Sequence, residues 1–199
     1  MLVAGRSIIA AEGFGALTVR RVASEVGANL GTFVYHFKTR DAFVKELIEA
    51  WYAPVFSRIT LAVDARARPL ERLRRAVLQL IDFGVDQEVF LARLLVAATA
   101  GEPAARRFVG SIAARHPRLL IKLIRAAQAD RTLVRDDPLQ ILMFLAASVG
   151  LPRLLTTAWQ GPPLFNVALS ASLSRIARDR DRIVQRLDWA LRGLSPGAQ

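Results

Sequence analysis

Helical spacing along almost the whole chain is the feature that most restricts how this protein can fold. Apolar residues recur three or four positions apart, whereas no stretch alternates apolar and polar residues for long enough to form a strand. Hydrophobic residues make up 53% of the 199 residues, which is enough to build a core. The sequence therefore predicts an all-α fold.

Glycine and proline mark the expected ends of the helices. Breaks are expected at residues 13–15, Gly27, Pro69, residues 101–103, 116–117, 136–138 and 161–163, which gives roughly nine or ten helices. The helices used below are expected over residues 2–12, 19–26, 30–36, 40–65, 88–100, 138–159 and 166–192. Pro54 is expected to bend the helix over residues 40–65.

Residues 17–40 carry the most specific local pattern. Thr18 is a good N-cap for a helix that starts at Val19, and Asn29 is a good N-cap for the helix that follows. Gly27 lies between the two helices and permits a sharp reversal of the chain. The pattern predicts a helix-turn-helix.

The second of these helices is expected to bury Phe33 and Phe37 and to leave its other side chains free for a DNA groove. Basic residues precede and follow it, where they could reach phosphates. The candidate DNA-binding residues are Thr18, Arg20, Arg21, Asn29, Leu30, Gly31, Thr32, Val34, Tyr35, His36, Lys38 and Arg40.

The stretch GANLGTFVYHFKTRDAF, together with Gly13, the Leu17-Thr18-Val19 step and Val22-Ala23, resembles the DNA-binding head of TetR-like repressors. The resemblance covers residues 2–48. It implies that Phe33 and Phe37 are core residues, and that the residues matching DNA-facing positions are Arg20, Leu30, Gly31, Thr32, Val34, Tyr35, His36, Lys38 and Arg40.

The chain departs from the family pattern in two places. Val34 stands where the family usually has a tyrosine that contacts phosphate, so that contact is either lost or passed to Tyr35. Met1 falls inside the family's first helix. We therefore expect either a start codon further upstream or a trimmed chain, with further basic residues before Met1.

Composition argues against several classes of function. The chain has no cysteine and only two histidines, His36 and His116, and it lacks metal-ligand spacings and phosphate-binding loops. We expect no catalytic residues, no metal and no cofactor, and an enzyme is the weakest alternative. The formal net charge of +11 suits a polyanionic partner, although an arginine-rich genome explains it equally well.

No targeting or membrane segment is expected. The N-terminus lacks the basic lead and long apolar run of a signal peptide. The most apolar window, residues 141–151, is too short to span a bilayer. These features predict a cytoplasmic protein that does not enter a membrane.

The family resemblance implies that residues 1–46 form the DNA-binding domain and residues 47–199 a helical domain for ligand sensing and dimerisation. Arg93 lies in a very apolar helix and needs an anion, either Asp82, Asp86 or a ligand carboxylate. Core packing remains the alternative for every aromatic candidate. The candidate ligand-binding residues are Phe83, Phe90, Arg93, Leu94, Phe108, Ile124, Gln128 and Phe144.

The two long C-terminal helices are expected to pair with their twofold mates in a homodimer, as the resemblance implies. The candidate interface residues are Leu142, Leu145, Ala146, Val149, Ile183, Leu187 and Leu191. His116 lies directly before Pro117, so it is expected at a helix boundary rather than as a base.

The function expected from this pattern is a ligand-responsive transcriptional regulator. It would be a repressor that binds a palindromic operator in double-stranded DNA as a dimer and is released by a small, largely apolar effector. The alternative is a helical small-molecule-binding or interaction protein that has lost DNA binding.

Overall fold

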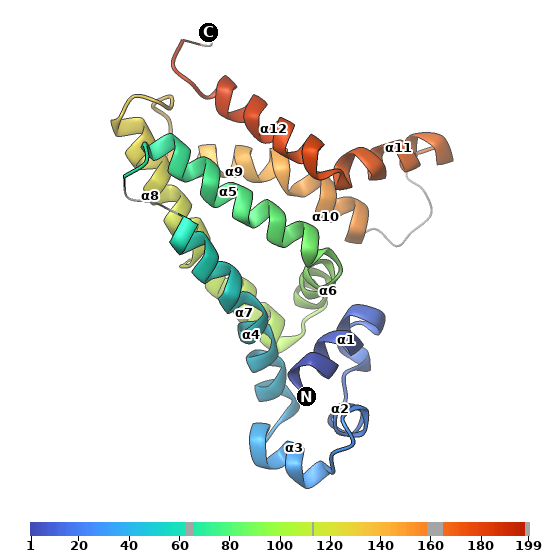
Figure 1. Cartoon of the computed structure of the whole chain (residues 1–199). Coiled ribbons are helices and arrows are strands. Elements are labelled where there is room, and N and C mark those ends of the chain that lie inside the picture. Colours follow the sequence, from blue (N-terminus) through green and yellow to red (C-terminus); the bar gives the residue numbers. More distant parts are fainter. Residues whose placement is uncertain (63–65, 113, 159–164, 198–199) are drawn as a thin grey trace. The chain divides into compact units, whose positions relative to one another are not determined.

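A computed structural model describes residues 1–62, 66–112, 114–158 and 165–197. These ranges contain twelve α-helices, one 3-10 turn and no strand, which confirms the all-α prediction (Figure 1). The helices are α1 (Leu2–Glu12), α2 (Val19–Glu25), α3 (Leu30–Phe37), α4 (Arg40–Ala62), α5 (Pro69–Asp86), α6 (Glu88–Thr99), α7 (Pro103–Ile112), α8 (His116–Ala129), α9 (Pro138–Val149), α10 (Leu151–Ala158), α11 (Val167–Arg178) and α12 (Arg180–Gly193), and the 3-10 turn η1 is Phe14–Ala16.

The helices form two compact units. The first unit comprises Met1–Pro54 and Val89–Ala113, and the second comprises Val55–Glu88 and Ala114–Gln199. Along the chain, the division falls inside α4, directly after Pro54. The expected functional division between residues 46 and 47 is a separate matter and stays a prediction.

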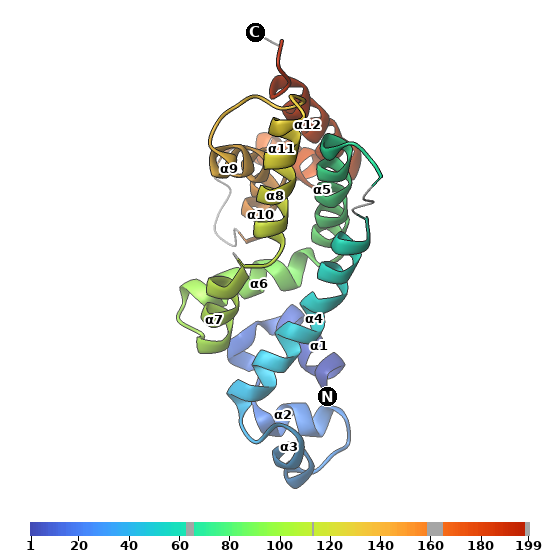
Figure 2. The ribbon, with the colours of Figure 1, turned by 90° about the vertical axis from the view of Figure 1, so that its left-hand side faces the viewer.

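The first unit is built on the short helices α1, α2 and α3. Each is too short to be stable alone, so each buries apolar residues against the others: Ile9 of α1, Val22 of α2 and Phe33 of α3 are fully buried. Gly5 of α1 allows an especially close approach, because a Cβ atom there would lie 2.7 Å from Cζ of Phe43 in α4. Figure 2 shows α1 beside the first half of α4.

Aromatic rings join α6 and α7 to the same unit. The ring of Phe90 in α6 lies 6.0 Å from Phe14 and 4.7 Å from Trp51 of α4, measured between ring centroids. Phe108 of α7 lies 5.2 Å from Tyr52. These contacts explain why α6 and α7 belong to the compact unit that contains the helix-turn-helix.

The second unit packs α5, α8, α9 and α12 around an aliphatic core. Leu73, Ile124, Ile141 and Leu187 come from these four helices in turn, and all are almost fully buried. Within this unit, α12 packs against both α5 and α9 (Figure 1).

A buried ion network lies near the start of α6. Arg153 is 9% exposed and donates to the carboxylate of Glu88, to the carbonyl oxygen of Arg178 at 2.7 Å and to that of Val85 at 3.4 Å. The guanidinium of Arg178 also pairs with Glu88, at 3.1 Å. A buried guanidinium is tolerated only with such partners. The sequence points to Arg93 as the cation in need of an anion, whereas Arg153 is the buried cation that the structure shows among the described residues.

Several expected helix boundaries were wrong. The helix expected over residues 138–159 breaks at Gly150 into α9 and α10, which are bent by 47°. The helix expected over residues 166–192 breaks at Asp179, whose carboxylate caps α12 by accepting from the amides of Asp181 and Arg182. The expected break at residues 161–163 lies outside the described residues.

Within the described ranges, no single helix is both long and apolar enough to cross a bilayer. The bent pair Pro138–Val149 and Leu151–Thr157 reaches the required length and hydropathy only when the two helices are taken together.

Candidate nucleic-acid interface

The helix-turn-helix has the local structure that the sequence predicted. Thr18 has an extended backbone, and its hydroxyl accepts a hydrogen bond from the amide of Arg21 at 3.2 Å. Gly27 follows α2 with a φ angle of +65°, which favours glycine. The side-chain oxygen of Asn29 accepts from the amide of Thr32 at 2.8 Å. Two side-chain caps and one glycine therefore fix where α2 ends and α3 begins.

The outer face of α3 is exposed and largely apolar. Phe33 faces inward and is fully buried, whereas Leu30 is 51% exposed, Val34 47% and Tyr35 82%. Gly31 and His36 are also exposed, and Thr32 is half-buried. Figure 2 shows α3 packed beside α2.

The four expected phosphate-binding cations fall into two groups, according to whether their side chains are already bound within the protein. Arg20 and Lys38 are exposed and have no ion-pair partner in the described part of the chain. Arg21 forms an ion pair with Glu12, and this hydrogen bond raises the pKa of Arg21 and lowers that of Glu12. Arg40 is bound within the protein, as described below, so its guanidinium is not free to contact DNA and the sequence-based assignment is corrected here.

Arg40 lies at the start of α4 and makes a dense internal network. Its guanidinium donates to the carbonyl oxygens of Leu17 and Phe14, both at 2.7 Å. It also donates to the carboxylate of Glu102, at 3.1 to 3.2 Å. The residue therefore holds the helix-turn-helix against α4 and the start of α7.

Lys38 ends α3 in an unusual backbone conformation. Its φ and ψ angles are +61° and −52°, a region in which residues with a side chain are strained. Its amide still donates to the carbonyl oxygen of Val34, at 3.0 Å. The strained residue therefore lies directly after α3, the helix that the sequence predicts to recognise DNA.

The remaining DNA-binding candidates lie on the same exposed part of the first unit. The structure does not test whether they contact DNA, and that stays a prediction. The exposed candidates are Thr18, Arg20, Asn29, Leu30, Gly31, Val34, Tyr35, His36 and Lys38, and the half-buried ones are Arg21 and Thr32.

The ligand-binding candidates do not form one described cavity. Phe90, Arg93, Leu94 and Phe108 belong to the first unit, whereas Phe83, Ile124, Gln128 and Phe144 belong to the second. Phe90 and Phe108 are part of the aromatic cluster, and Phe144 is exposed on α9.

The polar ligand candidates are bound to the main chain. Gln128 donates to the carbonyl oxygens of Val134 and Asp136, at 3.0 and 2.7 Å, and so holds the segment between α8 and α9. Arg93 donates to the carbonyl oxygen of Ala11, at 3.4 Å. One expected partner of Arg93 is taken, because Asp82 pairs with Arg180.

His116 is the first residue of α8, as expected. Burial, with a smaller contribution from the positive charge of Arg115, lowers the pKa of His116 to about 4. The imidazole is therefore neutral at physiological pH.

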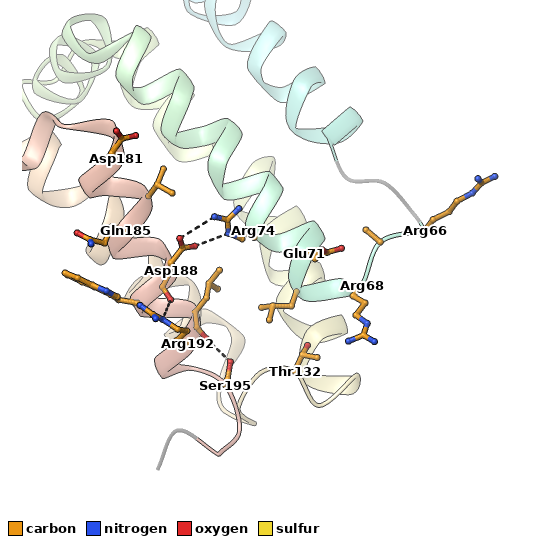
Figure 3. A pocket seen from close by; sticks show the side chains of 15 residues that line it. Arg66, Arg68, Glu71, Arg74, Thr132, Asp181, Gln185, Asp188, Arg192 and Ser195 are labelled. Carbon is orange, nitrogen blue, oxygen red and sulfur yellow. Dashed lines mark hydrogen bonds and ion pairs between the residues drawn. The ribbon is translucent and has the colours of Figure 1, made fainter.

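A wide, open groove of about 1170 Å³ lies between α5 and α12 in the second unit (Figure 3). Arg74 crosses it to pair with Asp188 at 3.0 Å, and Arg68 and Arg192 lie on its wall. None of the sequence-based ligand candidates lines this groove.

The expected dimer residues were mostly assigned to the wrong surface. Leu145, Val149, Ile183, Leu187 and Leu191 are buried where α9 and α12 belong to the core of a single chain. Leu142 is half-buried and only Ala146 is exposed. A residue buried within one chain cannot supply an interface, so these five assignments are corrected.

A different apolar surface was missed. It comprises exposed side chains of α9, α10 and α11, and we call it the C-terminal apolar face. Spacings of three and four residues could have indicated it, but buried stripes on the same helices gave the same signal. Its members are Leu139, Met143, Phe144, Leu151, Leu155, Val167, Leu169, Leu173 and Ile176.

The geometry of α2 and α3, with their caps, tight turn and exposed outer face, defines the class: this is an all-helical protein with an N-terminal helix-turn-helix. Residues 1–47 match the family model described as bacterial regulatory proteins, tetR family. The chain is 34% identical over 74 residues to the HTH-type transcriptional repressor KstR2 of Mycobacterium tuberculosis. That alignment covers 37% of each protein, little more than a third of the repressor's length.

Solved structures extend the likeness to the whole fold. A protein from Rhodococcus sp., assigned to the TetR family, superposes with a TM-score of 0.72 at 20% identity and covers 97% of this chain and 95% of its own. A transcriptional regulator from Saccharomonospora viridis, solved in complex with choline, gives 0.67 at 18% identity over 94% and 91% of the two chains. Residues 1–47 therefore match the model of the tetR family, and the fold of the chain is similar to that of solved proteins assigned to the same family.

Proposed function

We propose that this protein binds a palindromic DNA operator in the cytoplasm and represses transcription there. The observation that carries this proposal is the capped pair α2 and α3, whose outer face is exposed and which carries the exposed cations Arg20, on α2, and Lys38, directly after α3. In the proposed complex α3 enters the major groove, and the two cations bind phosphates on either side. The identity of 34% over 74 residues with a transcriptional repressor supports repression rather than activation.

The C-terminal apolar face supports a homodimer. Met143 is 60% exposed and Leu155 59%, and they lie on consecutive helices of one unit. Many exposed apolar side chains on neighbouring helices are typical of an interaction site. The proposed partner is the same face of a second copy, because a twofold dimer presents two recognition helices to the two halves of a palindrome.

Light scattering after size exclusion tests the dimer. Wild-type protein should elute at twice the mass of the chain, and Met143→Asp with Leu155→Asp should convert it to a monomer that keeps its helical circular dichroism. Leu61→Asp is the matched control, because Leu61 is an exposed leucine on α4 outside the face. A monomeric wild type, or a double variant that stays dimeric, would contradict the proposed interface.

We also propose that a small, largely apolar effector releases the DNA. The choline-bound regulator from Saccharomonospora viridis supports a small-molecule site in this fold. The open groove between α5 and α12 is rich in arginine, so it does not suit an apolar guest. A thermal-shift screen of small organic molecules, followed by a DNA-release assay on the hits, tests this part of the proposal.

Selection from random duplex DNA tests the main proposal. Purified protein should enrich an inverted repeat, and labelled duplexes that carry the repeat should shift in a native gel at concentrations that leave scrambled duplexes free. If no sequence is enriched and no duplex shifts at low salt, the alternative holds: a helical binding protein that has lost DNA recognition.

A further inference from the structure

The exposed surface of α3 lacks the side chains that usually read purines. Arginine and lysine pair with guanine in the major groove, and asparagine and glutamine pair with adenine. None of these four occurs within α3. Asn29, directly before α3, uses its side-chain oxygen to cap the helix and to accept from the hydroxyl of Thr32, at 3.1 Å.

The same surface carries an apolar ridge. Leu30 and Val34 are one helical turn apart and therefore share a face of α3. Each is about half exposed, at 51% and 47%, and Val26, at the end of α2, is 41% exposed. Apolar surface of this kind gains free energy only if a partner covers it with apolar atoms.

The surroundings of the ridge favour DNA as that partner. The same helix pair carries the exposed cations Arg20, on α2, and Lys38, directly after α3, and no acidic residue lies within α3. In the major groove of DNA, the 5-methyl group of thymine is the apolar group that a base presents to a side chain. A ridge of aliphatic side chains on a helix pair that also carries exposed cations is therefore complementary to a groove lined with thymine methyl groups.

We propose that Leu30 and Val34 determine operator specificity by packing against thymine methyl groups, so that each half-site presents thymine opposite each of these two residues. The inference rests on the proposed function, because it names the bases that the proposed recognition helix reads. The operator is therefore expected to be rich in thymine at the positions where α3 enters the major groove.

Replacement of thymine by deoxyuridine is the test, because it removes only the methyl group. Duplexes of the selected operator, each with deoxyuridine at one thymine position in both half-sites, are measured by fluorescence anisotropy at fixed salt. Two positions should each lose about fourfold in affinity per half-site, the loss expected for one buried methyl group. Thymines elsewhere should be insensitive.

Protein variants assign the two positions. Val34→Ala should bind more weakly and should abolish the deoxyuridine effect at one position, and Leu30→Ala should abolish it at the other. Val3→Ala is the matched control, because Val3 is an exposed valine on α1 outside the ridge, and it should leave both effects intact.

The outcomes separate this inference from the proposed function. If no duplex is selected or bound, the proposed function fails. If an operator is bound but deoxyuridine has no effect at any position, or if the Val34→Ala and Leu30→Ala variants retain both effects, methyl readout by this ridge is overturned and DNA binding stands.

Discussion

Arg40 and Glu102 form a charge-assisted pair between residues 62 positions apart in the sequence. Both terminal nitrogens of the Arg40 guanidinium donate to the Glu102 carboxylate, and the side chains are 33% and 13% exposed. Because Arg40 also donates to Leu17 and Phe14, the pair joins the start of α4, the turn before α2 and the start of α7. It is the polar counterpart of the aromatic contacts that place α6 and α7 in the first unit.

Loss of this pair should destabilise the first unit. Glu102→Gln should lower the free energy of unfolding by about 1.5 to 3 kcal/mol, the contribution of hydrogen bonds to a charged group that is shielded from water. Asp41→Asn is the control, because Asp41 pairs with Arg107 at a more exposed site. This variant should lower the free energy of unfolding by less than about 1 kcal/mol. Urea unfolding followed by circular dichroism measures both, and equal losses would contradict the structural role of Arg40.

Gly5→Ala and Gly84→Ala should have opposite effects. A Cβ at Gly5 would lie 2.7 Å from both Phe43 and Leu47, which are buried and cannot move aside, so overpacking should destabilise the protein by about 1 to 3 kcal/mol. A Cβ at Gly84 meets nothing within 4 Å, so alanine should stabilise α5 by up to about 1 kcal/mol. Thermal unfolding of the two variants measures both changes in stability. A Gly5→Ala variant as stable as the wild type would disprove the close approach of α1 to α4.

His116 should make stability fall below neutral pH. Its pKa is lowered to about 4 in the folded chain from the ordinary 6.5, so between these values only the unfolded chain binds the proton. The free energy of unfolding should therefore drop by about 1.4 kcal/mol for each pH unit from 6.5 down to 4 and level off below that. His116→Asn should remove this part of the pH profile, whereas His36→Asn, at an exposed site, should retain it. Parallel profiles for wild type and His116→Asn would refute the prediction.

Lys38→Gly should separate stability from DNA binding. Glycine relieves the strained positive φ angle, so the free energy of unfolding should rise by roughly 1 kcal/mol, while the loss of the cation weakens DNA binding. Lys38→Ala should weaken DNA binding without this gain, because its Cβ keeps the strain. A Lys38→Gly variant less stable than Lys38→Ala would show that the backbone conformation is not strained.

Local features of the helix-turn-helix were predictable from sequence, because their causes lie within a few residues. The hydroxyl of Thr18 and the side-chain oxygen of Asn29 each accept from an amide three residues later, and Gly27 supplies a backbone conformation that few other residues tolerate. Phe33 is buried because the helical period places it opposite the exposed face.

Long-range pairings were not predictable, because sequence spacing does not say which elements meet. An arginine in the position of Arg40 could contact phosphate, yet Glu102, directly before α7 and distant in the sequence, pairs with it. The pair of Arg153 with Glu88 is distant in the same way. The apolar stripe that includes Leu145 could equally cover the core or a partner, and the position of α12 decides that it covers the core.

The salt dependence of DNA binding tests the central claim most directly. On the selected operator, Arg20→Ala and Lys38→Ala should each reduce the slope of log affinity against log salt by about two, because each removes one phosphate contact in each of the two half-sites bound by the dimer. Arg21→Ala should change the slope less, because Glu12 already neutralises that cation. If the wild-type protein binds no duplex at low salt, or if neither variant changes the slope, the exposed face of α2 and α3 is not the surface that binds DNA.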